Sequence, residues 1–534
     1  MMKKIIAAVA AAGVATGVAL LAPTAGATPQ ATPSYQPPPV EWGECEDERL
    51  AEAGAECGFV EVPLNYAKPD GKKIKLAVSR IKHTSSEADY QGPMLVNPGG
   101  PGGSGLRLAI LGEYVPNGVG GQFDWIGFDP RGVGSSEPAL SCKPDHFGYN
   151  RPEYVPTTKE LERTWLRRSA EYAHACAESD AKELLPHLKT RDVVKDMESI
   201  RKALGVEKIN YYGFSYGTYL GQVYATQYPS RIHRAVFDGV VNPSTVWYEA
   251  NLNQDIHFDR VIKIYFDWIA RYDDVYRLGD KAIEVEQEFY KQKKLLDRKP
   301  AGGKIGSSEL TDLFLPAGYG QYQWDAIAKA FSAWVHDKDW KGLKELYDAG
   351  SEMGDDNGFA VYIGVECTDT QWPTSWKKWS EDNWRIHEWA PFETWANAWY
   401  NAPCLYWPAK AGTAPKVDGS KAPPILLISE EEDAATPFSG ALEVRKRFPK
   451  SSLISLPGGT THSGSLGGNA CVDDQIADYL ATGKLPERKN GNDSDAQCTP
   501  LPKPVPEGAK QLRAVKSAKQ PAVLEEALRP ARHG

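Results

Sequence analysis

Short apolar runs alternate with helical periodicity over about residues 90–242 of the chain. Each run ends in a turn or loop signal, which is typical of a buried strand. Helices are predicted between the runs, and one begins at Thr190 as its N-cap and stops at Gly205. The predicted strands cover residues 94–96, 125–128, 209–212 and 235–237, and a second helix covers residues 219–228. Strands that alternate with helices imply a mainly parallel sheet.

The pattern becomes helical between residues 245 and 415. Eight of the chain's sixteen tryptophans fall between residues 372 and 407. Strands return at residues 425–428 and 453–456, and a closing helix is predicted over residues 472–480. We therefore expect one α/β core that is split by a large helical cap insertion. The expected core comprises residues 41–244 and 416–498, and the expected cap comprises residues 245–415.

The N-terminus has the three parts of a secretory signal peptide. Lys3 and Lys4 precede an apolar stretch over residues 5–22, and the small residues Ala25-Gly26-Ala27 follow. We expect cleavage after Ala27, which makes residues 1–27 a signal peptide. The protein would then be secreted and extracellular, without membrane contact once the signal is removed. The alternative is an uncleaved anchor, because the apolar stretch approaches the length that spans a membrane.

Two proline-rich segments flank the part of the chain that is expected to fold. Residues 28–40 are expected to form a stiff linker or a pro-segment, and residues 499–534 an extended tail. The chain has 534 residues, of which 41% are hydrophobic and 10% aromatic, enough for a sizeable core. Its 61 basic and 70 acidic side chains give a net charge of −9 without a long basic run, which argues against nucleic acid as a partner. The oligomeric state stays open.

The chain has eight cysteines, an even number, and no Cys-x-x-Cys motif. An even count in a secreted protein favours disulfides over a zinc site or a thioredoxin-like redox motif. Pairing between sequence neighbours is the simplest of the many possible sets. It predicts the bonds Cys45–Cys57, Cys142–Cys176, Cys367–Cys404 and Cys471–Cys498.

The chemistry of the chain centres on the pentapeptide Gly213-Phe214-Ser215-Tyr216-Gly217. It lies between a predicted strand and a predicted helix, which is the context of a nucleophile elbow. In such an elbow the flanking residues must be small, because strand and helix approach closely at the serine. Ser215 is therefore the candidate nucleophile, and the backbone N–H of Tyr216 is a candidate oxyanion donor.

A serine nucleophile needs a base and an acid that orients the base. In this kind of fold their order along the chain is Ser, acid, His. Beyond the strand at residues 425–428, the candidate bases are His462 and His533, and His462 follows the last predicted strand through a glycine loop. Asp433 is the expected acid, with the preceding Glu430, Glu431 and Glu432 as alternatives in a run that could be a solvated loop.

A second oxyanion donor is expected in the glycine-rich loop over residues 97–105, with Gly100 as the first choice and Gly99 as the second. The same loop matches a dinucleotide-binding pattern at Gly100, Gly102 and Gly105. Pro101 counts against that interpretation, because it removes a backbone N–H that a pyrophosphate would use. A hydrolase mechanism requires no metal and no cofactor, and none is expected.

These motifs together resemble those of the proline iminopeptidase-like α/β-hydrolases. The resemblance rests on the loop at residues 99–102, the segment at residues 129–136, the elbow at residues 213–217 and Asp433-x-x-Thr436-Pro437. Within this group the chain is most similar to the secreted tripeptidyl aminopeptidases of actinobacteria. One departure is the histidine loop, Thr461-His462-Ser463-Gly464, where many relatives have a Gly-His-Gly-like setting. The resemblance implies an α/β-hydrolase fold and a serine exopeptidase that releases short peptides, typically tripeptides, from free N-termini.

The substrate of such an enzyme is a peptide or protein N-terminus. A free ammonium group that is desolvated in the cleft must be paired with negative charge. Glu366 and Asp369, which flank Cys367, are the candidates, and the alternative is an ordinary acidic pair beside a disulfide. A secreted carboxylesterase on the same scaffold is the alternative activity. A non-catalytic binding protein of the same fold would be expected to have lost one of the three catalytic residues, and none is missing here.

Overall fold

The computed structural model describes residues 35–351 and 353–509 of the chain. The expected signal peptide over residues 1–27, the first part of the linker and most of the expected tail lie outside the described residues. Among the residues that are described, no helix is long and apolar enough to cross a membrane.

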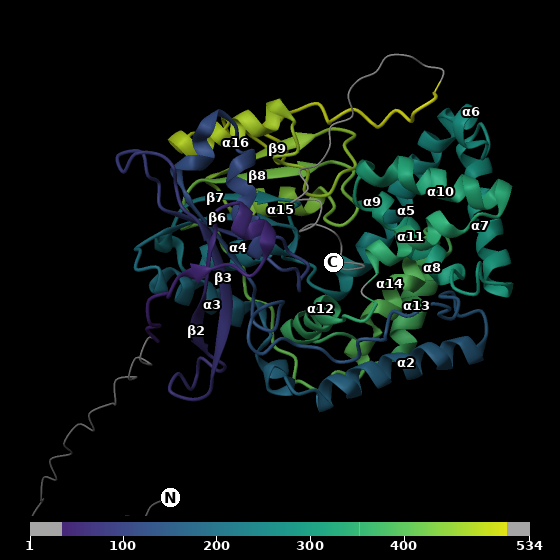
Figure 1. Cartoon of the computed structure of the whole chain (residues 1–534), viewed down its shortest axis with the longest axis horizontal. Helices are drawn as coiled ribbons and strands as arrows, with labels where there is room; N and C mark the ends of the chain where they lie inside the picture. The colour runs from purple at the N-terminus through teal and green to yellow at the C-terminus, as the bar shows by residue number, and fades with distance from the viewer. Residues whose placement is uncertain (1–34, 352, 510–534) are drawn as a thin grey trace, which may run out of the picture. The chain divides into compact units, whose positions relative to one another are not determined.

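The described residues contain a ten-stranded sheet in the order β1-β2-β3-β5-β4-β6-β7-β8-β9-β10. Its strands lie in the left half of Figure 1, and the helices α5 to α11 lie on the right. The strands are β1 (Gly43–Glu44), β2 (Glu56–Pro63), β3 (Lys73–Ile81), β4 (Pro93–Asn97), β5 (Asp124–Phe128), β6 (Ile209–Phe214), β7 (Ile232–Asp238), β8 (Ile425–Glu430), β9 (Ser451–Leu456) and β10 (Ala496–Gln497). The neighbours from β5 to β10 are parallel, whereas β3 pairs antiparallel with β2 and with β5. The prediction of a mainly parallel sheet is confirmed.

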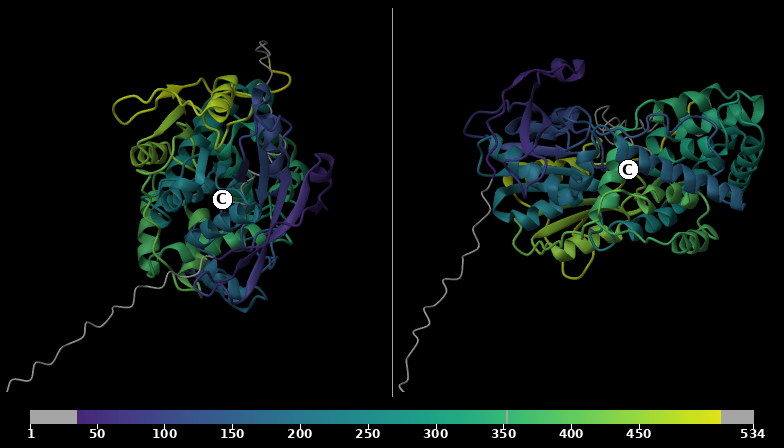
Figure 2. Two further views of the ribbon diagram at one scale, coloured as in Figure 1. Left: turned by 90° about the vertical axis from the view of Figure 1, so that its left-hand side faces the viewer. Right: turned by 90° about the horizontal axis from the view of Figure 1, so that it is seen from below.

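The apolar strands are buried on both faces, which explains why they are continuous apolar runs in the sequence. Leu95 and Leu427 pack into one core cluster, and their neighbours Val96 and Leu426 pack into another. Helices on the first face are α3 (Thr190–Ala203), α4 (Tyr216–Gln227) and α15 (Ser439–Arg447). On the second face lie α16 (Ala470–Thr482) and the 3₁₀ segments η1 (Leu106–Tyr114) and η2 (Pro116–Gln122). The helices on the two sides are visible in Figure 2.

Two details differ from the expectations. The strands β1, β2, β3 and β10 lie outside the predicted set: β1 and β10 have two residues each, β2 is partly exposed along its length, and β3 begins with alternating charged and apolar residues, so none of them is a continuous apolar run. Thr190 is not the N-cap of α3, because the cap residue is Lys189 and makes no side-chain cap bond. Instead, the N–H and the hydroxyl of Thr190 both donate to the carboxylate of Asp369, from a distant helix. Tertiary contact has replaced the local cap that the sequence pattern indicated.

Between β7 and β8 the chain is helical, as expected. The helices are α5 (Tyr248–Arg271), α6 (Asp273–Tyr276), α7 (Ala282–Arg298), α8 (Ser307–Phe314), α9 (Pro316–Tyr319), α10 (Trp324–Asp337), α11 (Lys341–Gly350), α12 (Asn357–Asp369), α13 (Trp376–His387) and α14 (Thr394–Asn401). The same insertion contains the 3₁₀ turns η5 (Gln321–Gln323) and η6 (Ala402–Leu405). The rest of the chain adds α1 (Glu48–Glu52), α2 (Lys159–Glu178) and the 3₁₀ turns η3 (Lys182–His187) and η4 (Pro229–Arg231).

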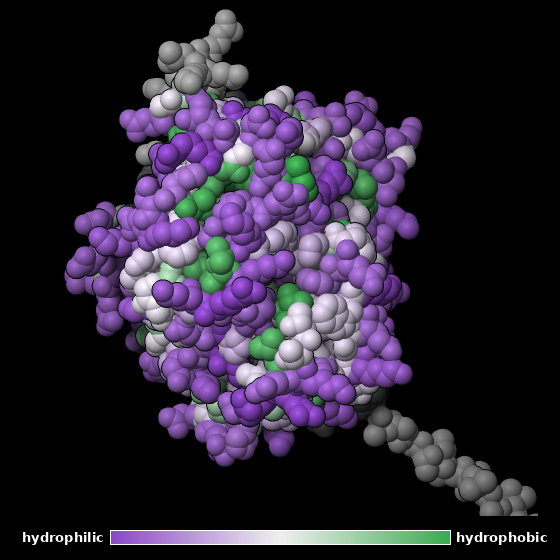
Figure 3. Space-filling view, turned by 90° about the vertical axis from the view of Figure 1, so that its right-hand side faces the viewer, coloured by the Kyte–Doolittle hydropathy of each residue, from purple (hydrophilic) through white to green (hydrophobic). Residues whose placement is uncertain are grey.

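The helical insertion has a core cluster of its own, which includes Phe266, Phe289, Phe314 and Phe331. The outer face near α7 is mainly hydrophilic, with small separate apolar spots (Figure 3). Helix α2 comes from before β6 but contacts α14 and η6. Helix α12, in contrast, lies within the insertion and packs into the core cluster of the sheet. A helix from before β6 therefore packs on the insertion, and a helix of the insertion packs on the sheet, so the boundary between cap and core does not follow the order of the chain.

Four disulfides are formed, and no cysteine of the described residues is free. They are Cys45–Cys57, Cys142–Cys176, Cys367–Cys404 and Cys471–Cys498, the pairs of sequence neighbours. Each bond closes a loop of 12 to 37 residues.

Candidate active site

Ser215 lies at a sharp turn between β6 and α4. Its backbone has φ 52° and ψ −126°, a conformation that residues other than glycine rarely adopt. The turn is possible because its flanks are glycines: a Cβ on Gly217 would lie 2.7 Å from the carbonyl oxygen of Asn97, and a Cβ on Gly213 would lie 2.6 Å from that of Gly217. The geometry is that of the nucleophile elbow expected from the sequence.

Asp433 follows β8 and is fully buried. Its carboxylate lies 2.8 Å from Nδ1 of His462. It also accepts hydrogen bonds from the backbone N–H groups of Ala435 and Thr436, at 2.9 Å each, and from the Thr436 hydroxyl at 2.7 Å. These donors hold the carboxylate in place, so Asp433 can orient the His462 ring.

His462 is buried, and its backbone N–H donates to the carbonyl oxygen of Tyr319, a residue of the cap, at 2.7 Å. Burial lowers the pKa of the imidazole, but the charge of Asp433 and the hydrogen bond to it outweigh this effect and raise the pKa overall. Because Nδ1 faces Asp433, Nε2 is left as the second ring position. Among the described residues, no group forms a hydrogen bond with His462 Nε2. The ring thus has one nitrogen that is oriented and one that can accept a proton.

The histidine loop lies against the serine turn through Asp238, the last residue of β7. The Asp238 carbonyl oxygen accepts from the N–H of Ser215 at 3.0 Å and from the Ser463 hydroxyl at 3.3 Å. Its carboxylate accepts from the N–H of Ser465 at 2.9 Å and from the Ser465 hydroxyl. Asp238 therefore links the two loops that carry Ser215 and His462. This role was not predicted, because its partners in the histidine loop, Ser463 and Ser465, lie 225 and 227 residues away in the sequence.

The three alternative acids contact other groups. Glu430 accepts the N–H of Thr461 at 2.6 Å, and burial raises its pKa to about 8. Glu431 accepts the Ser455 hydroxyl, and Glu432 pairs with Arg260. Asp433 is thus the member of the run whose carboxylate meets the imidazole, whereas Glu430 supports the loop that leads to it.

The glycine loop after β4 meets the serine turn directly. Gly99 has φ 97°, and a Cβ there would lie 2.9 Å from both the Ser215 Cβ and the Tyr216 nitrogen. Gly100 lines the cavity that also contains Ser215 and Tyr216. Tyr216 is the first residue of α4, so its N–H has no acceptor within the helix. Gly100, Ser215 and Tyr216 therefore line one cavity, as residues that form an oxyanion hole with the serine would have to do.

The other glycines of the loop are required by packing. A Cβ on Gly102 or Gly105 would lie 2.3 Å from a backbone oxygen, that of Gly358 or Phe128. The loop is also held by Asp129, which accepts the Ser104 hydroxyl at 2.6 Å and the Gly105 N–H at 3.0 Å. Gly102 and Gly105, which match the dinucleotide-binding pattern in the sequence, are thus glycines because other parts of the backbone lie too close for a side chain.

The two candidate acids of the substrate site lie in different surroundings, although they are three residues apart in α12. Glu366 is buried and lines the cavity of about 160 Å³ at Ser215. Asp369 does not line that cavity; its carboxylate accepts from Thr190 at the start of α3 and from the Trp247 indole. Asp369 therefore has a structural role, and Glu366 is the acid that a substrate in the cavity could meet.

Comparisons with known proteins identify the family of this chain. A family model described as "TAP-like protein" matches residues 390–498. The tripeptidyl aminopeptidase of Streptomyces lividans is 40% identical over 479 residues, covering 88% of each chain. The chain belongs to the tripeptidyl aminopeptidase family.

Relatives that are less similar to this chain have other names. The serine protease Hip1 of Mycobacterium tuberculosis is 29% identical and covers 84% of this chain and 90% of its own. Carboxylesterase B of the same species is 28% identical, with 84% and 89% covered. Membership of the tripeptidyl aminopeptidase family confirms the expected α/β-hydrolase fold and makes the protein a serine hydrolase, a serine peptidase of the α/β-hydrolase kind.

Proposed function

We propose that this serine peptidase is a secreted aminopeptidase that releases tripeptides from the free N-termini of peptides and proteins. The observation that carries the proposal is a buried carboxylate, Glu366, in the same cavity as Ser215. The Streptomyces relatives named tripeptidyl aminopeptidases support the length of the released peptide.

Glu366 is suited to pair with the α-ammonium group of a substrate. Burial, and then the charge of Asp369, raise the pKa of Glu366 well above its ordinary value. Within the described residues its carboxylate accepts one hydrogen bond, from Asn251 Nδ2 at 3.4 Å. The carboxylate therefore keeps acceptor capacity for a cationic donor, and an ammonium in the cavity would favour its charged form. A substrate with an acetylated N-terminus would leave it unpaired.

Ser215, His462 and Asp433 are proposed as the catalytic triad. His462 Nε2 takes the proton of the Ser215 hydroxyl while the serine oxygen bonds to the scissile carbonyl carbon. When the tetrahedral intermediate collapses, the C–N bond breaks and the imidazolium gives its proton to the leaving amine. Water then attacks the acyl-enzyme, transfers a proton to His462, and releases the short peptide as Ser215 regains its proton. Asp433 stabilises the imidazolium that forms in each half of the reaction.

The backbone N–H groups of Gly100 and Tyr216 are proposed to stabilise the oxyanion of both tetrahedral intermediates. A donor of this kind contributes roughly 3–4 kcal/mol to a transition state in a site that excludes water. The contribution is large because the donors are held by the fold before the charge develops.

Secretion is supported by two independent features. The first 27 residues have the charge, apolar stretch and small residues of a signal peptide. Every cysteine of residues 35–351 and 353–509 is in a disulfide, which is typical of an oxidising compartment. The proposed substrates are thus peptide N-termini outside the cell.

A secreted carboxylesterase is the second candidate, and the relative named carboxylesterase B is the observation that favours it. Both activities use the same acyl-enzyme chemistry. They differ in whether a free ammonium group on the acyl side is needed, which is the point that an experiment must address.

The test compares three chromogenic substrates: a tripeptide anilide with a free amine, the same anilide N-acetylated, and a short acyl ester. Each is incubated with the protein and with Ser215→Ala. We expect turnover of the free-amine anilide to exceed that of the acetylated one by at least about 100-fold, as expected for loss of a desolvated ion pair, and to be abolished by Ser215→Ala. Ester turnover without cleavage of either anilide would replace the aminopeptidase by the esterase. Activity that survives Ser215→Ala would refute the triad.

A further inference from the structure

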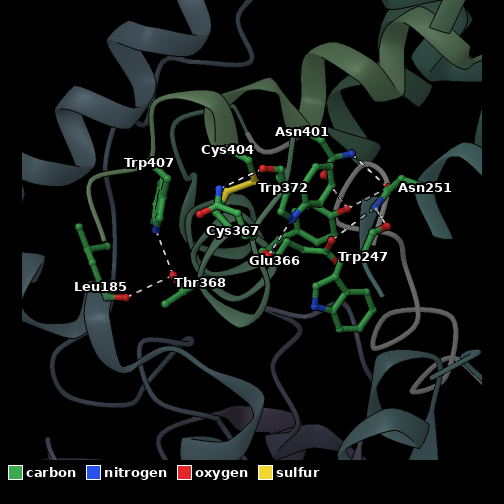
Figure 4. The surroundings of a disulfide bond; sticks show 12 residues. Leu185, Trp247, Asn251, Glu366, Cys367, Thr368, Trp372, Asn401, Cys404 and Trp407 are labelled. Atoms are coloured by element: carbon green, nitrogen blue, oxygen red, sulfur yellow. Dashed lines mark hydrogen bonds between the residues drawn. A yellow bond between two sulfur atoms is a disulfide. The ribbon is translucent and has the colours of Figure 1, made fainter. Parts of the chain in front are cut away.

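Asn251 lies beside Glu366, on helix α5 rather than on α12 (Figure 4). Its side chain is buried and lines the cavity at Ser215. The amide Nδ2 donates to the carbonyl oxygen of Trp247, one turn earlier, at 3.1 Å and to Glu366 Oε2 at 3.4 Å. Both protons of the amide group are thereby used, one for its own helix and one for the carboxylate.

The orientation of the Asn251 amide is set by its neighbours. Oδ1 accepts from Asn401 Nδ2 at 3.1 Å and from the Tyr362 hydroxyl at 3.4 Å. Asn401 Nδ2 also donates to the backbone oxygen of Asn397 at 3.1 Å, and because a carbonyl can only accept, this contact fixes the direction of the second amide. A flipped Asn251 would present its NH₂ group to the NH₂ group of Asn401, so the donor side must face Glu366.

The hydrogen bonds of Asn401 connect Asn251 to a third asparagine of the cap. Asn401 Nδ2 donates to Asn397 Oδ1 at 2.9 Å, and Asn397 Nδ2 donates to the backbone oxygen of Asn251 at 3.2 Å and to Asp255 at 2.8 Å. Three asparagines on two helices, α5 and α14, therefore form one buried network. Polar networks of this kind rigidify a site when their members are satisfied.

A disulfide lies next to the contact between Asn251 and Glu366. Cys367, the residue after Glu366, is bonded to Cys404 in η6, three residues after Asn401 (Figure 4). The backbone oxygen of Glu366 also accepts from the Trp372 indole at 2.9 Å. The segment that carries Glu366 is thus covalently joined to the segment that carries Asn401, which contacts the Asn251 amide.

We propose that Asn251 is a positioning residue that determines the selectivity for a free N-terminus by holding the Glu366 carboxylate in the orientation that meets the substrate ammonium group. This inference rests on the proposed function of Glu366. A glutamate side chain has three rotatable bonds, and Asn251 is the described side chain that restrains its carboxylate. Without this donor, the carboxylate would have to be ordered by the substrate itself, which weakens binding of the ammonium group.

The test measures KM and kcat for the free-amine and the N-acetylated tripeptide anilides with Asn251→Ala. We expect the ratio of kcat/KM between the two substrates to fall at least about tenfold, mainly through a higher KM for the free amine, because the reacting groups are untouched. Asn383→Ala is the matched control: Asn383 is also a buried cap asparagine that donates to the carbonyl one turn earlier, Trp379 O at 2.9 Å. Its variant loses a buried amide of the same kind and should keep the substrate ratio.

A double-variant cycle separates positioning from direct contact. In a Glu366→Gln background, Asn251→Ala should change the substrate ratio by less than about twofold if it acts through Glu366. An effect as large as that in the original background would overturn the proposal, as would an unchanged ratio in Asn251→Ala alone. If Glu366→Gln itself leaves the ratio unchanged, the proposed function of Glu366 has failed, which is a different result from a failure of Asn251.

Discussion

Ser215 and Gly99 occupy backbone conformations with positive φ at the point where the two turns of the site touch. For the serine this conformation presents the hydroxyl at the end of the sheet, and for the glycine it lets backbone approach the Tyr216 amide. Each residue type is therefore required by geometry as well as by chemistry.

The first prediction concerns Gly99→Ala. A methyl group there would lie 2.6 Å from the Phe214 carbonyl oxygen and 2.9 Å from the Tyr216 nitrogen, so the oxyanion region must move. We expect kcat to fall by about 10²–10³, the effect of losing one oxyanion donor, in steady-state assays with the free-amine anilide.

Gly118→Ala is the control for backbone strain alone. Gly118 also has a positive φ, of 70°, but no atom lies within 4 Å of the position of its added Cβ. Its variant should lose some stability and keep its kcat. Equal losses of kcat in the two variants would mean that strain, rather than the oxyanion region, explains the effect.

At the scale of elements, the ends of β7 and β8 hold the loop that carries His462. Asp238 binds Ser465, and Glu430 binds the N–H of Thr461, so one carboxylate lies on each side of the histidine. Burial raises the pKa of Asp238 to about 6 and that of Glu430 to about 8. Both carboxyls bind protons more tightly in the folded protein than in the unfolded chain.

The second prediction follows from the sign of this difference. A folded protein that binds more protons than its unfolded chain loses stability as the pH rises, here between the ordinary pKa of Glu430, 4.5, and about 8. Glu430→Gln keeps an acceptor for Thr461 and removes the titration. We expect the fall in Tm from pH 5 to pH 8 to be smaller in Glu430→Gln by roughly 1–4 °C, as measured by calorimetry.

Glu432→Gln serves as the comparison, because Glu432 belongs to the same acidic run but pairs with Arg260. Its pH dependence of Tm should match that of the unsubstituted protein. A Glu430→Gln protein whose Tm falls as steeply as before would show that Glu430 does not titrate in this range.

For the whole molecule, the site depends on the contact between cap and sheet. The N–H of His462 bonds to Tyr319 of the cap, and α12 brings Glu366 from the insertion to the cavity at Ser215. Two disulfides with loops of similar length, 34 and 37 residues, cross-link this arrangement at different places. Because the loops are similar in length, removal of either bond should affect global stability alike, whereas only Cys367–Cys404 adjoins a residue of the cavity, Glu366.

The third prediction compares the two double variants in which both cysteines of one bond become alanine. Loss of either Cys142–Cys176 or Cys367–Cys404 should lower the free energy of unfolding by about 2–4 kcal/mol. Only loss of Cys367–Cys404 should also reduce the preference for the free-amine anilide, because that bond adjoins Glu366. Denaturation curves and the substrate ratio test this, and equal effects on the ratio would contradict it.

Much of this protein was predictable from the sequence. Continuous apolar runs between helical segments predicted the parallel strands, because strands buried on both faces need no polar positions. Gly213 and Gly217 around Ser215, and the order of Ser215, Asp433 and His462, pointed to a hydrolase site because strand order places these loops at one edge of the sheet. The cysteine pairs followed from their order along the chain.

Tertiary structure decided what local patterns could not distinguish. Glu366 and Asp369 are equivalent in sequence, but one lines the cavity and the other binds the start of α3. In the sequence, Asn251 does not differ from other polar residues of a helix, and its role depends on the contacts of its amide with α12 and α14. Burial and hydrogen-bond partners determine the chemistry of such groups, and the sequence does not show these partners: Glu366 lies 115 residues from Asn251, and Asp369 lies 179 residues from Thr190.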